Sequence, residues 1–411
     1  MESEDRLPGN GHVLLKQFKY LAAKAIDHFI GLVCDVGLYH TNRNILPMRS
    51  GSKVLLIALD HLGDVVMGTP VIEALKSAFP QVEVTVLTRP SNAAVFWGNP
   101  FVGKVLVDDA PWWSVHPGFD CLRPSYWKAY IRNVRQLRRE QYDVIIDLRG
   151  DLRHLLLFGT AAKPRYLIGY GRTGGEALLS AIVPYDDDMH EIDKKLALLN
   201  PIGIGGIRPK PKIWLSSEDL EKARGFIVNL IGTVDPPLVL IDPGAKPIQQ
   251  WPTDRFASVA RRMSHELKRP LLVSAGPAYS HLAQELVSTA GCEAARLIRD
   301  VTIRELAAIL AVCDLVISSD TGVAHIASAV GTPTVTLYGP TDPERFWHGA
   351  EGSRVIQGNT TCCTPDLHHV CRHTESGKPG ICMLSISEDS LVSTLFMLLE
   401  RFRAVSGQSP T

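Results

Sequence analysis

Two short loops in this chain carry side chains that could do chemistry, and each one follows an apolar run. The first loop is residues 60–64 (DHLGD), which lead into a helical segment. A glycine such as Gly63 lets the backbone turn tightly or approach a ligand closely. Asp64 could act as a general base that takes a proton from an attacking hydroxyl. Alternatively, its carboxylate could cap the free amides at the start of the helix.

The second loop is residues 318–322 (SSDTG), and it also leads from a strand-like run into a helix. Gly322 and Thr321 stand where the helix begins, and a helix N-terminus suits a diphosphate. Phosphate would repel Asp320, so this carboxylate is better suited to a ribose or sugar hydroxyl, or to capping the helix. His325 lies one turn further on and could reach the same ligand or be a packed residue.

Two further loops in the second half have the glycines and prolines of sharp turns. Residues 242–246 (DPGAK) place Gly244 where backbone could approach a ligand, and Lys246 could neutralise phosphate charge. Residues 339–343 (GPTDP) predict a rigid turn that could wall a nucleotide pocket. Either loop could also be an ordinary turn.

Strands and helices must hold these loops in place. The sequence has apolar runs that are typical of strands buried on both faces. Strands are predicted at 53–59, 82–87, 104–107, 144–148, 238–241, 271–274, 315–318 and 334–338. Helices are predicted at 69–79, 126–139, 253–267, 303–312, 322–330 and 388–402. This alternation indicates an α/β fold with parallel sheets. Ligands bind at the carboxyl ends of such strands, so two halves facing across a cleft could hold two substrates.

The Gly- and Pro-rich stretch 184–211 is the clearest domain boundary. We expect an N-terminal amphipathic helix and linker at 1–50, Rossmann-like domains at 51–210 and 211–385, and a C-terminal helix and tail at 386–411. The helical pattern at 13–38 predicts either a helix resting on a membrane surface or one packed on the protein body or a second subunit.

Composition excludes several classes of protein. Lys+Arg and Asp+Glu both count 43, so the formal net charge is zero and nucleic acid is not an expected partner. The 8 cysteines are too sparse for a disulfide scaffold, which favours a reducing compartment. The acidic first residues do not resemble a secretory signal, and no stretch approaches ~20 apolar residues, so we expect a cytoplasmic protein.

Together these loops resemble glycosyltransferase family 9, the heptosyltransferase family of lipopolysaccharide core assembly. The resemblance runs from about residue 53 to about residue 402. Its most specific stretch is 319–343 (SDTGVAHIASAVGTPTVTLYGPTDP), followed by 53–75 (KVLLIALDHLGDVVMGTPVIEAL). Residues 241–257 match more weakly.

The resemblance implies a GT-B architecture, in which two Rossmann-like domains face each other across a cleft, and an inverting transfer without a metal ion or other cofactor. It implies that Asp64 is the general base on the acceptor side. It also implies that the donor is bound by residues of the 60–64 loop, the 242–246 loop and the segment 318–325. The donor-binding residues are then Gly63, Gly244, Lys246, Asp320, Thr321, Gly322 and His325.

The same resemblance implies the substrates. The family donor is commonly ADP-heptose, and the acceptor is commonly a lipid-linked core oligosaccharide. A peripheral contact with the cytoplasmic face of the inner membrane would follow from such an acceptor.

The sequence departs from the family pattern in three places. Gln249 stands where the family often has a lysine shortly before Trp251, and Lys246 could substitute for it. Residues 274–281 (SAGPAYSH) lack the acidic residue often found in that loop. In the aromatic connection 108–130, Trp112 and Trp113 could stack on acceptor sugars or form a small local core.

A cysteine cluster leaves a second hypothesis open. Cys362, Cys363, Cys371 and Cys382 lie near three histidines and could bind a structural metal, or they could be ordinary thiols. Certain relatives that glycosylate autotransporter proteins hold iron with a cysteine motif here. A protein O-heptosyltransferase with a structural metal is therefore one alternative, and a non-catalytic nucleotide-sugar-binding protein is another.

Overall fold

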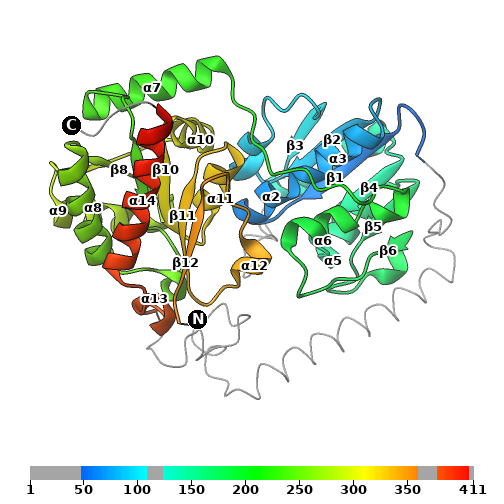
Figure 1. Cartoon of the computed structure of the whole chain (residues 1–411). Helices are drawn as coiled ribbons and strands as arrows, with labels where there is room; N and C mark the ends of the chain where they lie inside the picture. Colours follow the sequence, from blue (N-terminus) through cyan, green and yellow to red (C-terminus); the bar gives the residue numbers. More distant parts are fainter. Residues whose placement is uncertain (1–47, 109–123, 360–376, 407–411) are drawn as a thin grey trace. The chain divides into compact units, whose positions relative to one another are not determined.

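The computed structural model describes residues 48–108, 124–359 and 377–406. The chain divides into two compact units, with the boundary between Lys210 and Pro211 (Figure 1). Each unit is a parallel sheet covered by helices, as the alternating pattern predicts. None of the helices in the described ranges is long and apolar enough to cross a membrane.

The first unit has a six-stranded sheet in the order β3-β2-β1-β4-β5-β6, with every neighbouring pair parallel. Its strands are β1 (Lys53–Ala58), β2 (Glu83–Thr88), β3 (Lys104–Val107), β4 (Val144–Asp147), β5 (Tyr166–Gly169) and β6 (Ala181–Ile182). Its helices are α2 (Leu62–Gly68), α3 (Pro70–Ala78), α4 (Pro124–Glu140), α5 (Leu152–His154) and α6 (Glu191–Ala197). Short 3-10 or π segments lie at Pro90–Val95, Leu155–Thr160, Glu176–Leu178 and Asn200–Ile202.

The second unit repeats this plan in the order β12-β11-β10-β7-β8-β9, again all parallel. Its strands are β7 (Val239–Asp242), β8 (Leu271–Val273), β9 (Ala295–Leu297), β10 (Leu315–Ser319), β11 (Thr334–Tyr338) and β12 (Arg354–Gln357). Its helices are α7 (Ser217–Ile231), α8 (Thr253–Leu267), α9 (Ser280–Ala290), α10 (Ile303–Val312), α11 (Gly322–Ala329), α12 (Pro343–Phe346), α13 (Ile381–Leu384) and α14 (Glu388–Ser406). Short 3-10 segments lie at Pro247–Gln249 and Pro277–Tyr279.

The central strands are apolar along most of their length because helices cover both of their faces. In β1, the side chains from Val54 to Ala58 are all buried, and Leu315 to Ile317 of β10 are fully buried as well. Each unit has its own core. The core of the second unit includes Trp251, which is fully buried and donates its indole N–H to the carbonyl of Ile386 at 3.1 Å.

The eight strands predicted from apolar runs are all present, and the helix predicted at 126–139 is α4. Four strands were missed, namely β5, β6, β9 and β12, and so were helices α5, α6, α7, α9, α12 and α13. The missed strands are two to four residues long. Strands β6, β9 and β12 lie at a sheet edge, and β5 lies next to one. Helix α6 falls inside the Gly- and Pro-rich stretch that we interpreted as a pause in the alternation.

Some expectations fall on parts of the chain outside the described residues. These are the N-terminal amphipathic helix, Trp112 and Trp113, and three of the four clustered cysteines: Cys362, Cys363 and Cys371. Cys382 is described, and it is buried in the core of the second unit. Across the described ranges, no group of three or more His, Cys, Asp and Glu side chains is placed to hold a metal ion.

Candidate active site

Both predicted loops lie where the strand order of their sheet reverses. In the first unit the reversal is between β1 and β4, and in the second it is between β7 and β10. Chain connections leave such a pair of strands toward opposite sides, which opens a crevice at their carboxyl ends. Residues 60–64 follow β1 and residues 242–246 follow β7, while residues 320–325 follow β10. The sequence-predicted residues are thus placed at the crevice of each unit.

In the first unit, Asp64 lies in the first turn of α2 and is partly exposed. The residue at the N-cap is His61, and no side-chain cap is formed there. The neighbouring Asp60 accepts a hydrogen bond from the His61 amide at 2.8 Å, whereas the Asp64 carboxylate accepts none from the described residues. The capping alternative for Asp64 is therefore not supported.

The surroundings of Asp64 favour its protonated form. Burial, followed by the charge of Asp60, raises the pKa of Asp64 to about 7, and Glu191 acts in the same direction. Lys195 and Arg149 oppose this rise. A carboxyl group with a pKa near neutral is suited to proton transfer at physiological pH, because it accepts a proton readily yet is substantially ionised.

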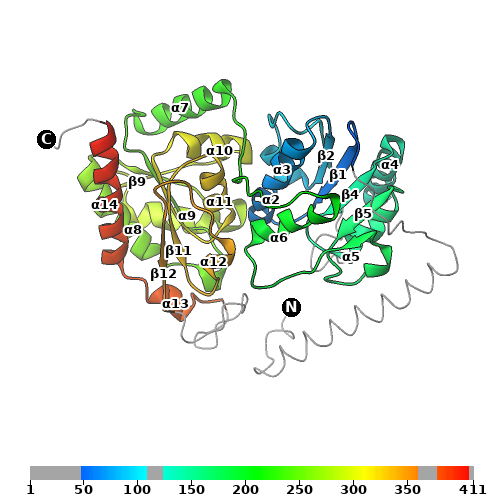
Figure 2. The same cartoon turned by 45° about the vertical axis from the view of Figure 1, so that its right-hand side comes forward.

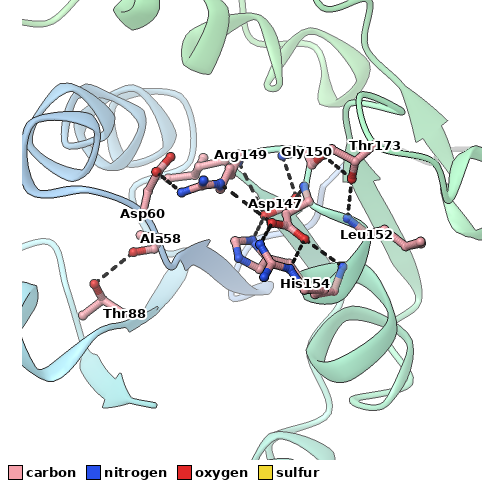
Figure 3. A network of polar contacts seen from close by, with 12 residues as sticks. Ala58, Asp60, Thr88, Asp147, Arg149, Gly150, Leu152, His154 and Thr173 are labelled. Atoms are coloured by element: carbon pink, nitrogen blue, oxygen red, sulfur yellow. Dashed lines mark hydrogen bonds and ion pairs between the residues drawn. The ribbon is translucent and has the colours of Figure 1, made fainter. Parts of the chain in front are cut away.

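Arg149 was not predicted from the sequence. It follows β4 and forms an ion pair with Asp60, so it joins the two sides of the crevice (Figure 3). A second acid, Asp151, lies 3.9 Å from the Arg149 Nε. Because Arg149 follows a predicted strand directly, the rule that ligands bind at strand carboxyl ends could have drawn attention to it.

The turn that presents Arg149 is held by the fully buried side chain of Asp147. Its carboxylate accepts the amides of Gly150 at 2.7 Å and Asp151 at 3.0 Å, and it bonds His154 Nδ1 at 2.8 Å (Figure 3). Gly150 has a φ of +77°, and a Cβ there would lie 3.0 Å from the Tyr170 side chain. These contacts give the turn one defined conformation, which fixes the backbone position from which the Arg149 side chain extends.

Helix α6 contributes three charged side chains that sequence reasoning also missed. The Lys194 ammonium lies 2.7 Å from Glu191 Oε1, and Lys195 donates to the carbonyl of Leu148 at 3.2 Å. All three residues are buried. In the sequence these residues lie in a Gly- and Pro-rich stretch for which no helix is predicted. The packing of α6 against α2 brings Glu191 and Lys195 close enough to act on the pKa of Asp64.

In the second unit, Asp320 is the centre of a polar cluster. Its carboxylate lies 3.6 Å from His325 Nε2 and accepts a bond from the Gln249 amide at 3.4 Å. It also bonds the hydroxyl of buried Tyr338, whose pKa rises well above its usual value through burial and through the charge of Asp320. No side chain caps α11 at Thr321, so the capping alternative for Asp320 is not supported either.

His325 is nearly buried and is paired with a second histidine that the sequence did not single out. His325 Nδ1 and His348 Nε2 are 2.8 Å apart, and the two rings stack with centroids 4.9 Å apart. At the same edge of the sheet, the hydroxyls of Ser318, Ser319, Thr321 and Thr341 are buried without a partner in the described structure. Buried hydroxyls usually find partners, so these four are exceptions within the second unit.

In the 242–246 loop, the side chain of Asp242 holds the backbone in place, and Lys246 takes no part in this. Asp242 accepts the Gly244 amide and the Ser274 hydroxyl, each at 3.0 Å, and burial raises the pKa of Asp242 to about 7. A Cβ at Gly244 would lie 3.1 Å from both Asp242 and Tyr279. Lys246 is exposed and forms no ion pair within the described ranges, so its ammonium is available for an anion.

The two signature glycines occupy helix starts. Gly63 is the second residue of α2 and Gly322 is the first residue of α11. Neither has a positive φ, so the tight turn that we considered for Gly63 does not occur. What both positions retain is a backbone amide in the first turn of a helix that begins at the crevice.

Comparison with known proteins decides the family. The family profile of glycosyltransferase family 9 (heptosyltransferase) matches residues 130–376, more than half of the chain. The chain belongs to glycosyltransferase family 9. It is therefore a glycosyltransferase, and the two Rossmann-like units are those of a GT-B enzyme.

Individual relatives agree with this family. The chain is 24% identical to the lipopolysaccharide core heptosyltransferase OpsX of Haemophilus influenzae over 300 residues, which cover 71% of this chain and 80% of OpsX. The fold is similar to that of E. coli ADP-heptose LPS heptosyltransferase II, with a TM-score of 0.71 and 17% identity, over 85% of this chain and 99% of that one.

A more distant structural similarity, to an iron-containing enzyme, is relevant to the hypothesis of a structural metal. The iron-containing dodecameric glycosyltransferase TibC of enterotoxigenic E. coli matches 87% of this chain and 79% of its own, with a TM-score of 0.51 and 11% identity. At that identity the likeness concerns the fold alone.

Proposed function

We propose that this family 9 glycosyltransferase moves a heptose, or a similar sugar, from an ADP-activated donor to a lipopolysaccharide core acceptor. The observation that carries the proposal is Asp64, a carboxyl group at the crevice of the first unit with a pKa of about 7 and no hydrogen bond from the described residues. The names of the relatives supply the sugar and the acceptor, because OpsX is a lipopolysaccharide core heptosyltransferase.

The proposed chemistry is a single inverting displacement. An acceptor hydroxyl attacks the anomeric carbon from the face opposite the diphosphate, and its proton passes to the Asp64 carboxylate. The bond from the anomeric carbon to the diphosphate oxygen breaks, and ADP leaves with the electron pair. No step requires a metal ion, provided that protein groups stabilise the charge on the departing diphosphate.

Groups for that task are present in the second unit. The first amides of α11, from Gly322 onward, carry the positive end of the helix dipole, and the exposed ammonium of Lys246 adds a full charge. We assign Asp320 to the donor's hydroxyl groups, because a carboxylate accepts hydrogen bonds from a sugar and repels phosphate. Thr321 and His325 lie beside it and complete the proposed donor site. We assign Gly63 to the same ligand through its backbone amide.

The proposed setting follows from the acceptor. A lipid-linked core glycan is assembled at the cytoplasmic face of the inner membrane, so we propose a cytoplasmic enzyme that touches that face. We also propose that residues 51–210 hold the acceptor and residues 211–385 hold the donor.

The direct test is transfer by the purified full chain, supplied with ADP-heptose and a core acceptor that lacks the heptose. Release of ADP together with a mass gain of one heptose on the acceptor supports the proposal. Binding of ADP-heptose by calorimetry without turnover on any lipopolysaccharide acceptor would contradict it and favour the non-catalytic alternative. Stoichiometric iron or zinc in the protein, with transfer to a protein hydroxyl, would favour the protein O-heptosyltransferase instead.

The role of Lys195 can be tested through pH dependence. Lys195 lowers the pKa of Asp64, so Lys195→Met should raise that pKa and move the acidic limb of kcat/KM to higher pH by about one unit. Lys76→Met is the matched control, because Lys76 bonds the carbonyls of Pro80 and Val82 away from Asp64. An unmoved limb in Lys195→Met would show that Asp64 does not control the acidic limb.

A further inference from the structure

Helix α4 belongs to the first unit (Figure 2). Its sequence carries a stripe of positive charge that no feature of the proposed reaction uses. Lys128, Arg132, Arg135 and Arg139 follow each other at steps of four, three and four residues, so they share one helix face. All four are exposed, and none has an ion-pair partner within the described ranges. We call these four residues the α4 stripe.

The opposite face of α4 is fixed to the protein body. Val134 and Leu137 are buried, and the Asn133 amide donates to the carbonyl of Val107 at 3.0 Å and to Asp108 at 2.7 Å. The Tyr130 hydroxyl donates to the carbonyl of Leu157 at 2.9 Å. The helix therefore cannot roll without breaking these contacts, and the α4 stripe faces outward permanently.

The charge of α4 is not balanced nearby. Its sequence holds five basic residues and one acid, Glu140. That acid already lies 2.6 Å from Lys104 Nζ and 3.6 Å from Lys53 Nζ. The whole chain has a formal net charge of zero, so the stripe is a local concentration of charge rather than part of a generally basic protein.

Two apolar side chains adjoin the α4 stripe on one side. Trp127 and Ile131 are four residues apart, and each is 43% exposed. Tryptophan beside lysine and arginine on one helix face is the combination that an anionic bilayer binds, since the ring enters the interfacial layer while the cations meet the headgroups. A nucleic acid would satisfy the charges and leave the isoleucine uncovered.

We infer that the α4 stripe, with Trp127 and Ile131, docks the enzyme on an anionic lipid bilayer. In a parallel α/β unit, a connecting helix begins at the carboxyl edge of the strands, so the Trp127 end of α4 lies at the same edge as Asp64. Docking along this helix would hold the carboxyl edge of the first sheet, and with it the crevice of the first unit, close to the membrane. The benefit of this docking for sugar transfer rests on the proposed lipid-linked acceptor. Binding of the α4 stripe to an anionic bilayer does not depend on that proposal.

The test is sedimentation of the full chain with vesicles, in the absence of donor and acceptor. Vesicles of phosphatidylcholine with about one-third phosphatidylglycerol should bind the protein, and about 1 M NaCl should release it, because the Debye length falls to about 3 Å. Each charge contributes roughly a fivefold change in partitioning, so Arg132→Gln with Arg135→Gln and Arg139→Gln should weaken binding about 100-fold. Circular dichroism checks that the variant is folded.

The matched control removes the same charge elsewhere. Arg224, Lys268 and Arg299 are exposed residues of the second unit without ion pairs in the described structure, and their replacement by Gln should leave binding unchanged. Equal binding by the α4 variant, equal loss in the control, or equal binding to pure phosphatidylcholine would overturn the inference. So would a duplex DNA that binds as tightly as the anionic vesicles and is lost in the same variant.

A second readout separates this inference from the proposed function. The α4 variant should transfer heptose to a water-soluble, deacylated core as fast as the wild type, and should slow only on an acceptor held in anionic vesicles. If the wild type transfers to neither acceptor, the proposed function fails while the vesicle result stands by itself.

Discussion

Replacing Asp64 by asparagine is expected to lower kcat for transfer by roughly 10²–10⁴-fold, the range found when a general base is removed. Asparagine keeps the size of the side chain but cannot take the proton of the attacking hydroxyl. In the wild type, kcat/KM should fall about tenfold per pH unit below about 7, where the carboxylate becomes protonated. Steady-state kinetics over pH 5–9 measure both effects. A variant with more than a tenth of the wild-type kcat would exclude Asp64 as the base.

The same substitution should stabilise the protein at alkaline pH. The folded-state pKa of Asp64 is raised, so ionising this carboxyl disfavours folding. This penalty is absent below about pH 4, grows between pH 4 and pH 7, and is complete above pH 7. Asp64→Asn should therefore gain on the order of 2 kcal/mol at pH 8, less than the full pKa shift implies because the carboxyl is partly exposed and screened. The gain should disappear as the pH approaches 4.

Glu73→Gln is the control for Asp64→Asn. Glu73 is a partly exposed acid in the first turn of the neighbouring helix α3, and it should affect neither kcat nor the pH dependence of stability. Thermal unfolding at several pH values gives the comparison. A loss of activity accompanied by a loss of stability at pH 8 would mean that Asp64 acts on the structure instead of the reaction.

Replacing Asp320 by alanine is expected to lower kcat/KM for the nucleotide-sugar by about 100-fold or more, chiefly through a higher KM for the donor. The carboxylate contacts His325, Gln249 and Tyr338, so its loss removes the proposed acceptor of the donor's hydroxyls and leaves three neighbours without their shared partner. A buried polar group without its partner costs about 1–3 kcal/mol. Some destabilisation should therefore accompany the loss of donor binding.

Asp314→Ala, which removes the acceptor oxygen altogether, separates the two effects of Asp320→Ala. Asp314 precedes the same strand, β10, at its other end and accepts the amide of Leu238 at 2.7 Å. This control should lose stability while its KM for the donor stays within about threefold of the wild type. Calorimetric titration with ADP-heptose measures donor affinity directly. Unchanged affinity in Asp320→Ala would remove Asp320 from the donor site.

Much of the frame could be predicted, because strands covered on both faces leave long apolar runs. KVLLIA of β1 and TVTLY of β11 are such runs. Short strands near sheet edges, such as Ala295–Leu297, are partly polar and too brief to stand out. The loops after β1 and β10 could be located for the same reason as the strands. Each loop begins where a long apolar run ends.

The charged partners of Asp64 could not be predicted. Glu191 and Lys195 lie in a stretch rich in Gly and Pro, so their sequence context indicates a solvated segment. Their burial arises only when α6 packs against α2. His348 is comparable, because it is far from His325 in the chain and meets it only in the fold.

The repeated strand order of the two units has an evolutionary consequence. Each sheet carries a complete crevice with its own set of polar residues and its own core. A mutation that changes the side chains of one crevice therefore leaves the packing beneath the other crevice unchanged, because each unit has a separate hydrophobic core. On the proposed assignment of the acceptor to the first unit and the donor to the second, substitutions that change the choice of acceptor can accumulate in the first unit without altering the donor site.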